Sequence, residues 1–61
     1  MLVLKRDTNE RIIIEVPPSD ETTRVEIQVV ERDRNGTRLG IAAPPAVRID
    51  REEIWRRRQA G

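Results

Sequence analysis

The chain has 61 residues, of which 36% are hydrophobic and 38% are charged, and its formal net charge at pH 7 is +1. It contains no cysteine and no histidine, which excludes disulfide bonds and metal sites built from those residues. A domain of this length buries only about 60% of the surface that its unfolded chain exposes. We therefore expect a single domain over residues 1–61 that completes its core by forming a homodimer.

The charges are divided unevenly along the chain. Residues 1–31 carry four basic against seven acidic side chains, a net of −3, whereas residues 32–61 carry eight basic against four acidic ones, a net of +4. All the cations except Lys5 are arginines, whose planar guanidinium suits bidentate contacts with phosphates and base edges. Composition alone fits a solvated arginine-rich surface better than a binding site. If the chain binds an anionic ligand, we expect the contacts to come from residues 32–61.

Apolar residues recur with a period of two, which is typical of β-strands. We expect strands at residues 1–6, 11–16, 23–31, 37–41 and 47–50, with an exposed proline-rich loop at 17–22. In the third strand, Val25, Ile27 and Val29 fall on one face, which we expect to be buried. Asn35-Gly36 predicts a type I′ hairpin, because both central residues of that turn need positive φ.

A short helix is expected after the last strand. Asp50 fits the N-cap position, and Glu53, three residues later, would complete a capping box. Ile54 is the expected apolar anchor, and Trp55 beside it is interpreted as a packing residue rather than as a platform for a base. Residues 56–58 are arginines that suit the negative end of the helix dipole, with phosphate binding as the alternative.

The residue types argue against an enzyme. The chain lacks His, Cys and Tyr, and its one serine, Ser19, lies in the proline-rich loop without a base to activate it. Glu52 and Glu53 are adjacent at a helix start, where acids are expected for dipole reasons and where the two side chains diverge. Asp33 and Asn35 lie in a turn too short for a calcium loop. We expect no catalytic residue, no metal and no cofactor.

Arg51 stands out by its position. It has the parity of Val47 and Ile49, which places it at the edge of the apolar side where the strand gives way to the helix. From the residues alone, a stem that covers the core, with its head in water or paired with Glu52 or Glu53, explains Arg51 more readily than ligand binding does.

Two segments of the chain resemble a known family. Residues 1–6 read MLVLKR, and residues 38–54 read RLGIAAPPAVRIDREEI, which joins a strand end, a proline break, a second strand and a helix start in fixed register. These segments are similar to the carbon storage regulator (CsrA/RsmA) family of bacterial post-transcriptional regulators, and the similarity spans nearly the whole chain.

The resemblance implies a mostly β, intertwined homodimer in which each chain has five short antiparallel strands and a short C-terminal helix. It implies two symmetric surfaces, each with the first strand of one chain beside the last strand of the other. There the family binds single-stranded or hairpin-loop RNA with a GGA core near ribosome-binding sites, which represses translation or alters mRNA stability. The RNA-binding set that we expect is Leu4, Lys5, Arg6, Arg38, Ala43, Pro44, Ile49, Asp50 and Arg51. Arg51 matches the arginine most essential to RNA binding in the family. With the resemblance, RNA binding therefore explains Arg51 better than the structural role that the residues alone favour.

The chain departs from the family at Asp7, where a second arginine is usual, and in the longer loop at 17–22. A diverged paralogue that binds a protein partner or forms a heterodimer is therefore one alternative, and a small swapped-hairpin DNA-binding dimer is another. The low net charge argues against DNA binding. The charged start at Lys5 leaves no apolar stretch long enough for a signal peptide or a membrane span, so we expect a cytoplasmic protein.

Overall fold

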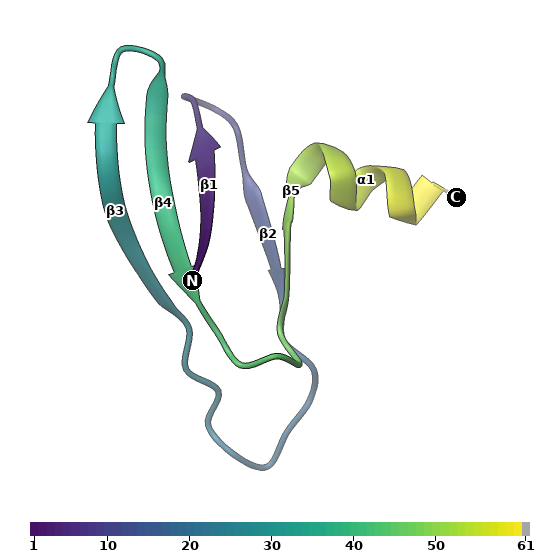
Figure 1. The fold of residues 1–61 in the computed structure, drawn as a ribbon. Helices are drawn as coiled ribbons and strands as arrows, with labels where there is room; N and C mark the ends of the chain where they lie inside the picture. The colour runs from purple at the N-terminus through teal and green to yellow at the C-terminus, as the bar shows by residue number, and fades with distance from the viewer. Residues whose placement is uncertain (61) are drawn as a thin grey trace.

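The computed structural model describes residues 1–60, which form five strands and one helix (Figure 1). In chain order the elements are β1 (Leu2–Arg6), β2 (Ile12–Glu15), β3 (Glu26–Asp33), β4 (Gly36–Ala42), β5 (Arg48–Arg51) and α1 (Glu52–Ala60). The strands make two separate antiparallel sheets, one with the order β1-β4-β3 and one that pairs β2 with β5. The expected mostly β class with a short C-terminal helix is confirmed.

The first sheet places its apolar residues in register across three strands. Leu4 lies opposite Leu39 of β4, and Val29 of β3 lies opposite the same leucine. Because successive side chains of a strand point to opposite faces, these residues share one face of the sheet. Leu2 and Ile41 form the next pair on that face, and Ile41 is the one apolar side chain of residues 1–60 that is fully buried, with 2% of its surface exposed.

The expected hairpin is present, but its predicted turn type is wrong. Asp33 pairs with Gly36, so the two-residue loop is Arg34-Asn35 rather than Asn35-Gly36. Neither loop residue has a positive φ; that conformation falls on Gly36, at φ 136°. Glycine at the fourth position is typical of a type I turn, and the backbone amide of Asn35 donates to Oδ1 of Asp33 (2.8 Å). A Cβ at Gly36 would lie 2.9 Å from the carbonyl oxygen of Arg6, which explains why glycine fits here.

The predicted capping box is also wrong. Arg51 pairs with Ile12, which extends β5 by one residue beyond the predicted end and makes Glu52 the first residue of the helix. The Asp50 carboxylate does not cap the helix start, because it accepts two hydrogen bonds from Arg58 in the last turn (2.7 and 3.0 Å). The expected distribution of charge remains: acids lie in the first turn of α1 and arginines in the last.

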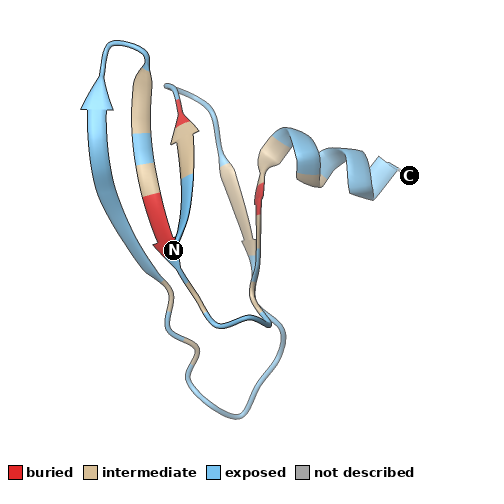
Figure 2. Cartoon of the chain, in the orientation of Figure 1, coloured by how far each residue is buried: buried red, intermediate tan, exposed pale blue. Residues whose placement is uncertain are grey.

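The core of one chain is thin. The chain measures 41 × 29 × 15 Å along its principal axes, and every residue of β3 is exposed (Figure 2). Ile27 and Val29 are 58% and 60% exposed, whereas Val25, before the strand, is half-buried. The buried face that we expected for this strand is therefore absent within one chain, because β3 packs on β4 at the outer edge of its sheet and β2 and β5 lie beyond the opposite edge.

Candidate nucleic-acid interface

The residues expected to bind RNA lie in three places. The first is a hollow of about 280 Å³ at the start of β1, where Ala43, Pro44 and Ile49 meet Leu2 and Ile41. The link between β4 and β5 crosses this end of the first sheet, since prolines break the strand after Ala42. The hollow thus brings together three of the expected residues from the segment between β4 and the end of β5.

The second place is the opposite face of the first sheet. Lys5 and Arg38 are directly opposite each other on β1 and β4. Like charges in such a cross-strand pair repel, and neither cation forms an ion pair with another residue of the range 1–60. This pair is therefore an anion-attracting point on the sheet surface, separated from Leu4 by the thickness of the sheet.

The third place is the junction of β1, β5 and α1, which contains Arg6 and Arg51. Arg6 is the last residue of β1 and is only 8% exposed. Its guanidinium donates two parallel hydrogen bonds to the carboxylate of Glu53, from Nη1 to Oε1 (3.0 Å) and from Nη2 to Oε2 (2.9 Å). Nε donates to the carbonyl of Lys5 (3.0 Å), and Nη1 also donates to the carbonyl of Arg11 (2.9 Å). The sequence did not indicate that Arg6 is enclosed in this way.

Arg51 is half-buried at the end of β5 and lies on the face of Ile49, as its parity predicted. It forms no ion pair within residues 1–60, in contrast to the pairing with Glu52 or Glu53 that we considered. Its positive charge nevertheless contributes to lowering the pKa of Glu53. Arg51 is therefore a cation next to the Arg6–Glu53 pair. Its own guanidinium is uncommitted, because it forms no ion pair within residues 1–60.

The pKa of Glu53 sets the pH range in which this junction is intact. The hydrogen bonds from Arg6 lower the pKa of Glu53 from 4.5 to about 2. A carboxylate with a depressed folded-state pKa stabilises the fold above its unfolded pKa and loses that contribution as the pH falls through the folded value. We expect the contribution to be complete above pH 4.5 and lost near pH 2.

Melting curves between pH 7 and 2 should therefore show a fall in Tm below about pH 4.5, and the fall should be smaller for Glu53→Gln than for the unmodified protein. Equal falls in Tm would contradict this prediction.

Two residues at the junction have partners that the sequence did not reveal. Glu53, expected in a capping box, instead binds Arg6, and Asp50, expected at the RNA surface, binds Arg58 of the helix. Glu53 and Arg6 are 47 positions apart, so no local pattern joins them. The indole nitrogen of Trp55 donates to Glu15 (2.9 Å), which adds a contact between α1 and β2 and agrees with a packing role.

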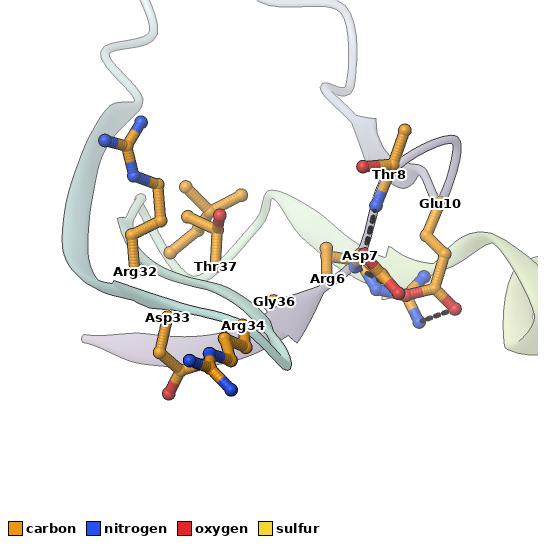
Figure 3. A pocket seen from close by; sticks show the side chains of 10 residues that line it. Arg6, Asp7, Thr8, Glu10, Arg32, Asp33, Arg34, Gly36 and Thr37 are labelled. Carbon is orange, nitrogen blue, oxygen red and sulfur yellow. Dashed lines mark hydrogen bonds and ion pairs between the residues drawn. The ribbon is translucent and has the colours of Figure 1, made fainter.

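A further hollow of about 530 Å³ lies beside the β3–β4 turn, and sequence reasoning did not single it out (Figure 3). Its lining includes Arg32 and Arg34, neither of which forms an ion pair within residues 1–60. Asp7 also lines it, and its Oδ1 accepts a hydrogen bond from the backbone amide of Thr8 (2.7 Å). The Asp7 carboxylate therefore helps to form the turn after β1.

Within residues 1–60, no three acidic side chains lie close enough together to hold a metal ion. The helix of this range has nine residues and is neither long nor apolar enough to cross a bilayer.

Comparison with known proteins identifies the family. Residues 1–60 match the family described as CsrA, the global regulator protein family. The chain is 43% identical over 54 residues to the translational regulator CsrA of Halothermothrix orenii, covering 88% of this chain and 58% of the relative. It is 46% identical over 55 residues to the translational regulator CsrA of Geobacter metallireducens, covering 90% of this chain and 62% of the relative. For the translational regulator CsrA of Leifsonia xyli, the identity is 41% over 54 residues, covering 88% of this chain and 55% of the relative.

The chain thus spans somewhat more than half the length of these relatives. No solved structure matches it. The family match nevertheless extends over all the residues that the structure describes, and it includes both strands that carry the expected site, β1 and β5. The chain therefore belongs to the CsrA family of global regulator proteins.

Proposed function

We propose that this chain is a translational regulator that binds RNA through the junction around Arg51. The observation that carries the proposal is the half-buried Arg51 at the end of β5, whose guanidinium forms no ion pair within residues 1–60. An arginine with a partly covered stem and a guanidinium that no acid engages can bind a base edge or a phosphate in bidentate geometry. The relatives that are 41–46% identical are named translational regulators, which supports the same activity.

The proposed RNA is single-stranded or forms a hairpin loop, and it carries a GGA core. Sequence-specific recognition of RNA favours unpaired bases, whose edges are open to side chains and to main-chain groups. Edge strand β1 has main-chain groups that face no other strand of residues 1–60, and the apolar hollow at Ala43, Pro44 and Ile49 offers a surface against which a base can pack. Leu4 completes the apolar part of the proposed site, and Lys5 and Arg38 supply attraction for the RNA backbone.

We propose that the active form is a homodimer in which β1 of one chain lies beside β5 of the other. Within one chain, β1 pairs with β4 and β5 pairs with β2, so each keeps one free edge among the described residues. The exposed face of β3 supports a second copy, because Ile27 and Val29 would be covered by it. Two sites on one dimer would let one RNA bind twice and so raise its overall affinity.

Regulation in this proposal requires no catalysis. A dimer bound across a ribosome-binding site excludes the ribosome by occupying the same nucleotides, and binding elsewhere changes access of nucleases to the message. The proposed function places the protein in the cytoplasm, where messages are translated. Asp50 and Arg6 belong to this site as supports, because their side chains already bind Arg58 and Glu53.

Selection of ligands from a random RNA pool tests the proposal. We expect enrichment of hairpins with GGA in the loop, and a mobility shift that is lost when GGA is changed to CCA in the same hairpin. A duplex DNA of equal length serves as the control for attraction by charge alone. Equal binding of all three ligands, or of none at low salt, would overturn the proposed function.

A further inference from the structure

The guanidinium of Arg6 has almost no capacity left for a ligand. It makes four hydrogen bonds of 2.9–3.0 Å, two to Glu53 and one each to the carbonyls of Lys5 and Arg11. Nη2 also lies 3.6 Å from Oε2 of Glu10. A guanidinium has five N–H donors, so these contacts use nearly the whole group. With 8% of its surface exposed, the side chain of Arg6 offers no free face to an RNA phosphate.

The partners of Arg6 are linked to the two residues that follow Arg51. The Arg11 carbonyl accepts one hydrogen bond from Nη1 of Arg6 (2.9 Å) and a second from the backbone amide of Glu52 (3.1 Å), the residue that follows Arg51. Glu53, one position further, holds the other side of the same guanidinium. On the strand side, Arg51 is fixed by its pairing with Ile12. The turn from β5 into α1 is therefore tied to the end of β1 at the two residues after Arg51.

We infer that Arg6 and Glu53 form a clamp that positions Arg51 for RNA, so that Arg6 is a positioning residue and not an RNA contact. This inference rests on the proposed function. The clamp crosses between the two sheets, joining the end of β1 in the first to the helix that follows the second. It fixes the direction in which the chain leaves β5 and hence the place from which the Arg51 side chain projects. Glu53 remains ionised throughout the physiological range, since its pKa is about 2.

A role for Glu53 as a competitor of RNA would predict the opposite effect of its substitution on RNA affinity. If Glu53 were a competitor that shields Arg6 from RNA, its neutralisation would free a cation and strengthen binding. Long-range electrostatics predicts the same sign, because removing any acid near the site reduces repulsion of phosphate. The clamp predicts weaker binding on neutralisation of Glu53, because a neutral amide cannot hold the guanidinium through two charge-assisted hydrogen bonds.

Glu53→Gln should lower affinity for the GGA hairpin by roughly three- to tenfold, as expected when a residue outside the contact surface is coupled to one within it. The matched control is Glu52→Gln, which removes the same charge from the adjacent helical position but contacts Arg11 and Arg56 rather than Arg6. We expect Glu52→Gln to bind as tightly as the unmodified protein or slightly more tightly. Stronger binding by Glu53→Gln would overturn the clamp in favour of competition.

Arg6→Lys keeps the charge but removes the planar fork, so the clamp predicts a loss of affinity similar to that of Glu53→Gln. A lysine that binds as well as arginine would overturn the inference. The loss should also depend on Arg51: in an Arg51→Ala background, Glu53→Gln should cause no further loss. Additive losses would mean that Glu53 acts on RNA binding by another route and would reject the positioning role.

Amide hydrogen exchange separates failure of the clamp from failure of the proposed function. Glu53→Gln should speed exchange at the Glu52 amide, which donates to the carbonyl that Arg6 also binds, whereas Arg51→Ala should not. If the unmodified protein binds no RNA, the proposed function fails, and unchanged exchange at Glu52 would in addition disprove the clamp. If neither Glu53→Gln nor Arg6→Lys folds, the pair supports the whole chain and the positioning role is rejected.

Discussion

Arg51→Ala should lose most of its affinity for a GGA hairpin, by roughly 10- to 100-fold, while the fold and the homodimer persist. Arg51 is half-buried, forms no ion pair within residues 1–60 and lies where β5 passes into α1. Its removal therefore leaves no buried acid without a partner, which is why we expect little change in stability. A bidentate contact to a base edge contributes about 1–3 kcal/mol to discrimination, and the loss should reflect that amount.

Arg57→Ala is the matched control for Arg51→Ala. Arg57 is exposed in the last turn of α1 and, within the range 1–60, has no ion pair, so the two variants remove the same charge. Titration by mobility shift at two salt concentrations should show a large loss for Arg51→Ala and a small one for Arg57→Ala. Similar losses would indicate binding by charge alone, and unchanged binding by Arg51→Ala would remove this residue from the site.

Val29→Lys should prevent assembly of the proposed homodimer and, with it, stable folding. Val29 is 60% exposed in one chain, on the apolar face of the first sheet that continues to Leu39 and Leu4. Burying a valine side chain stabilises a structure by about 1.5–3 kcal/mol, whereas burying an unpaired lysine opposes it strongly. Because a symmetric dimer contains the substitution twice, the effect should exceed what a chain with so thin a core can tolerate.

Light scattering at micromolar concentration measures this prediction. We expect a mass of about twice 7.1 kDa for the unmodified chain, and a monomer mass or loss of the β circular dichroism signal for Val29→Lys. Gln28→Lys is the control, since Gln28 is the preceding residue of β3 and points to the opposite face. A mass near 7.1 kDa for the unmodified chain would disprove the homodimer, and a normal dimer of Val29→Lys would exclude this face as its interface.

The local features of the fold could be predicted because they depend on neighbours in the sequence. Alternating apolar residues indicated the strands, glycine located the β3–β4 hairpin, and the acids at the start and arginines at the end indicated the helix. The hairpin loop, Arg34-Asn35, and the end of β5, at Arg51, are each displaced by one residue from the prediction, whereas β3 spans Glu26–Asp33 rather than the predicted 23–31. These differences arise because cross-strand pairing, with Gly36 opposite Asp33, Glu26 opposite Ala42 and Ile12 opposite Arg51, decides where a strand starts and stops.

The candidate site was likewise predictable from the sequence only in part. The parity of Arg51 in its strand was readable from the sequence, and the resemblance of residues 1–6 and 38–54 to the CsrA family agreed with the family match over residues 1–60. The partners of Arg6 and Asp50 could not be predicted from the sequence. Glu53 lies 47 positions from Arg6, and Arg58, in the last turn of α1, lies 8 positions from Asp50.

The sequence by itself determined the strand periodicity, the family and the shortage of core, because all three are properties of composition and of short segments. Only the tertiary structure decided that β1 pairs with β4 and β2 with β5, and that β3 remains uncovered. It also placed Glu53 against Arg6 and left Arg51 uncommitted. Such contacts join segments far apart in the chain, and their geometry depends on how two sheets and a helix are placed together rather than on any local preference.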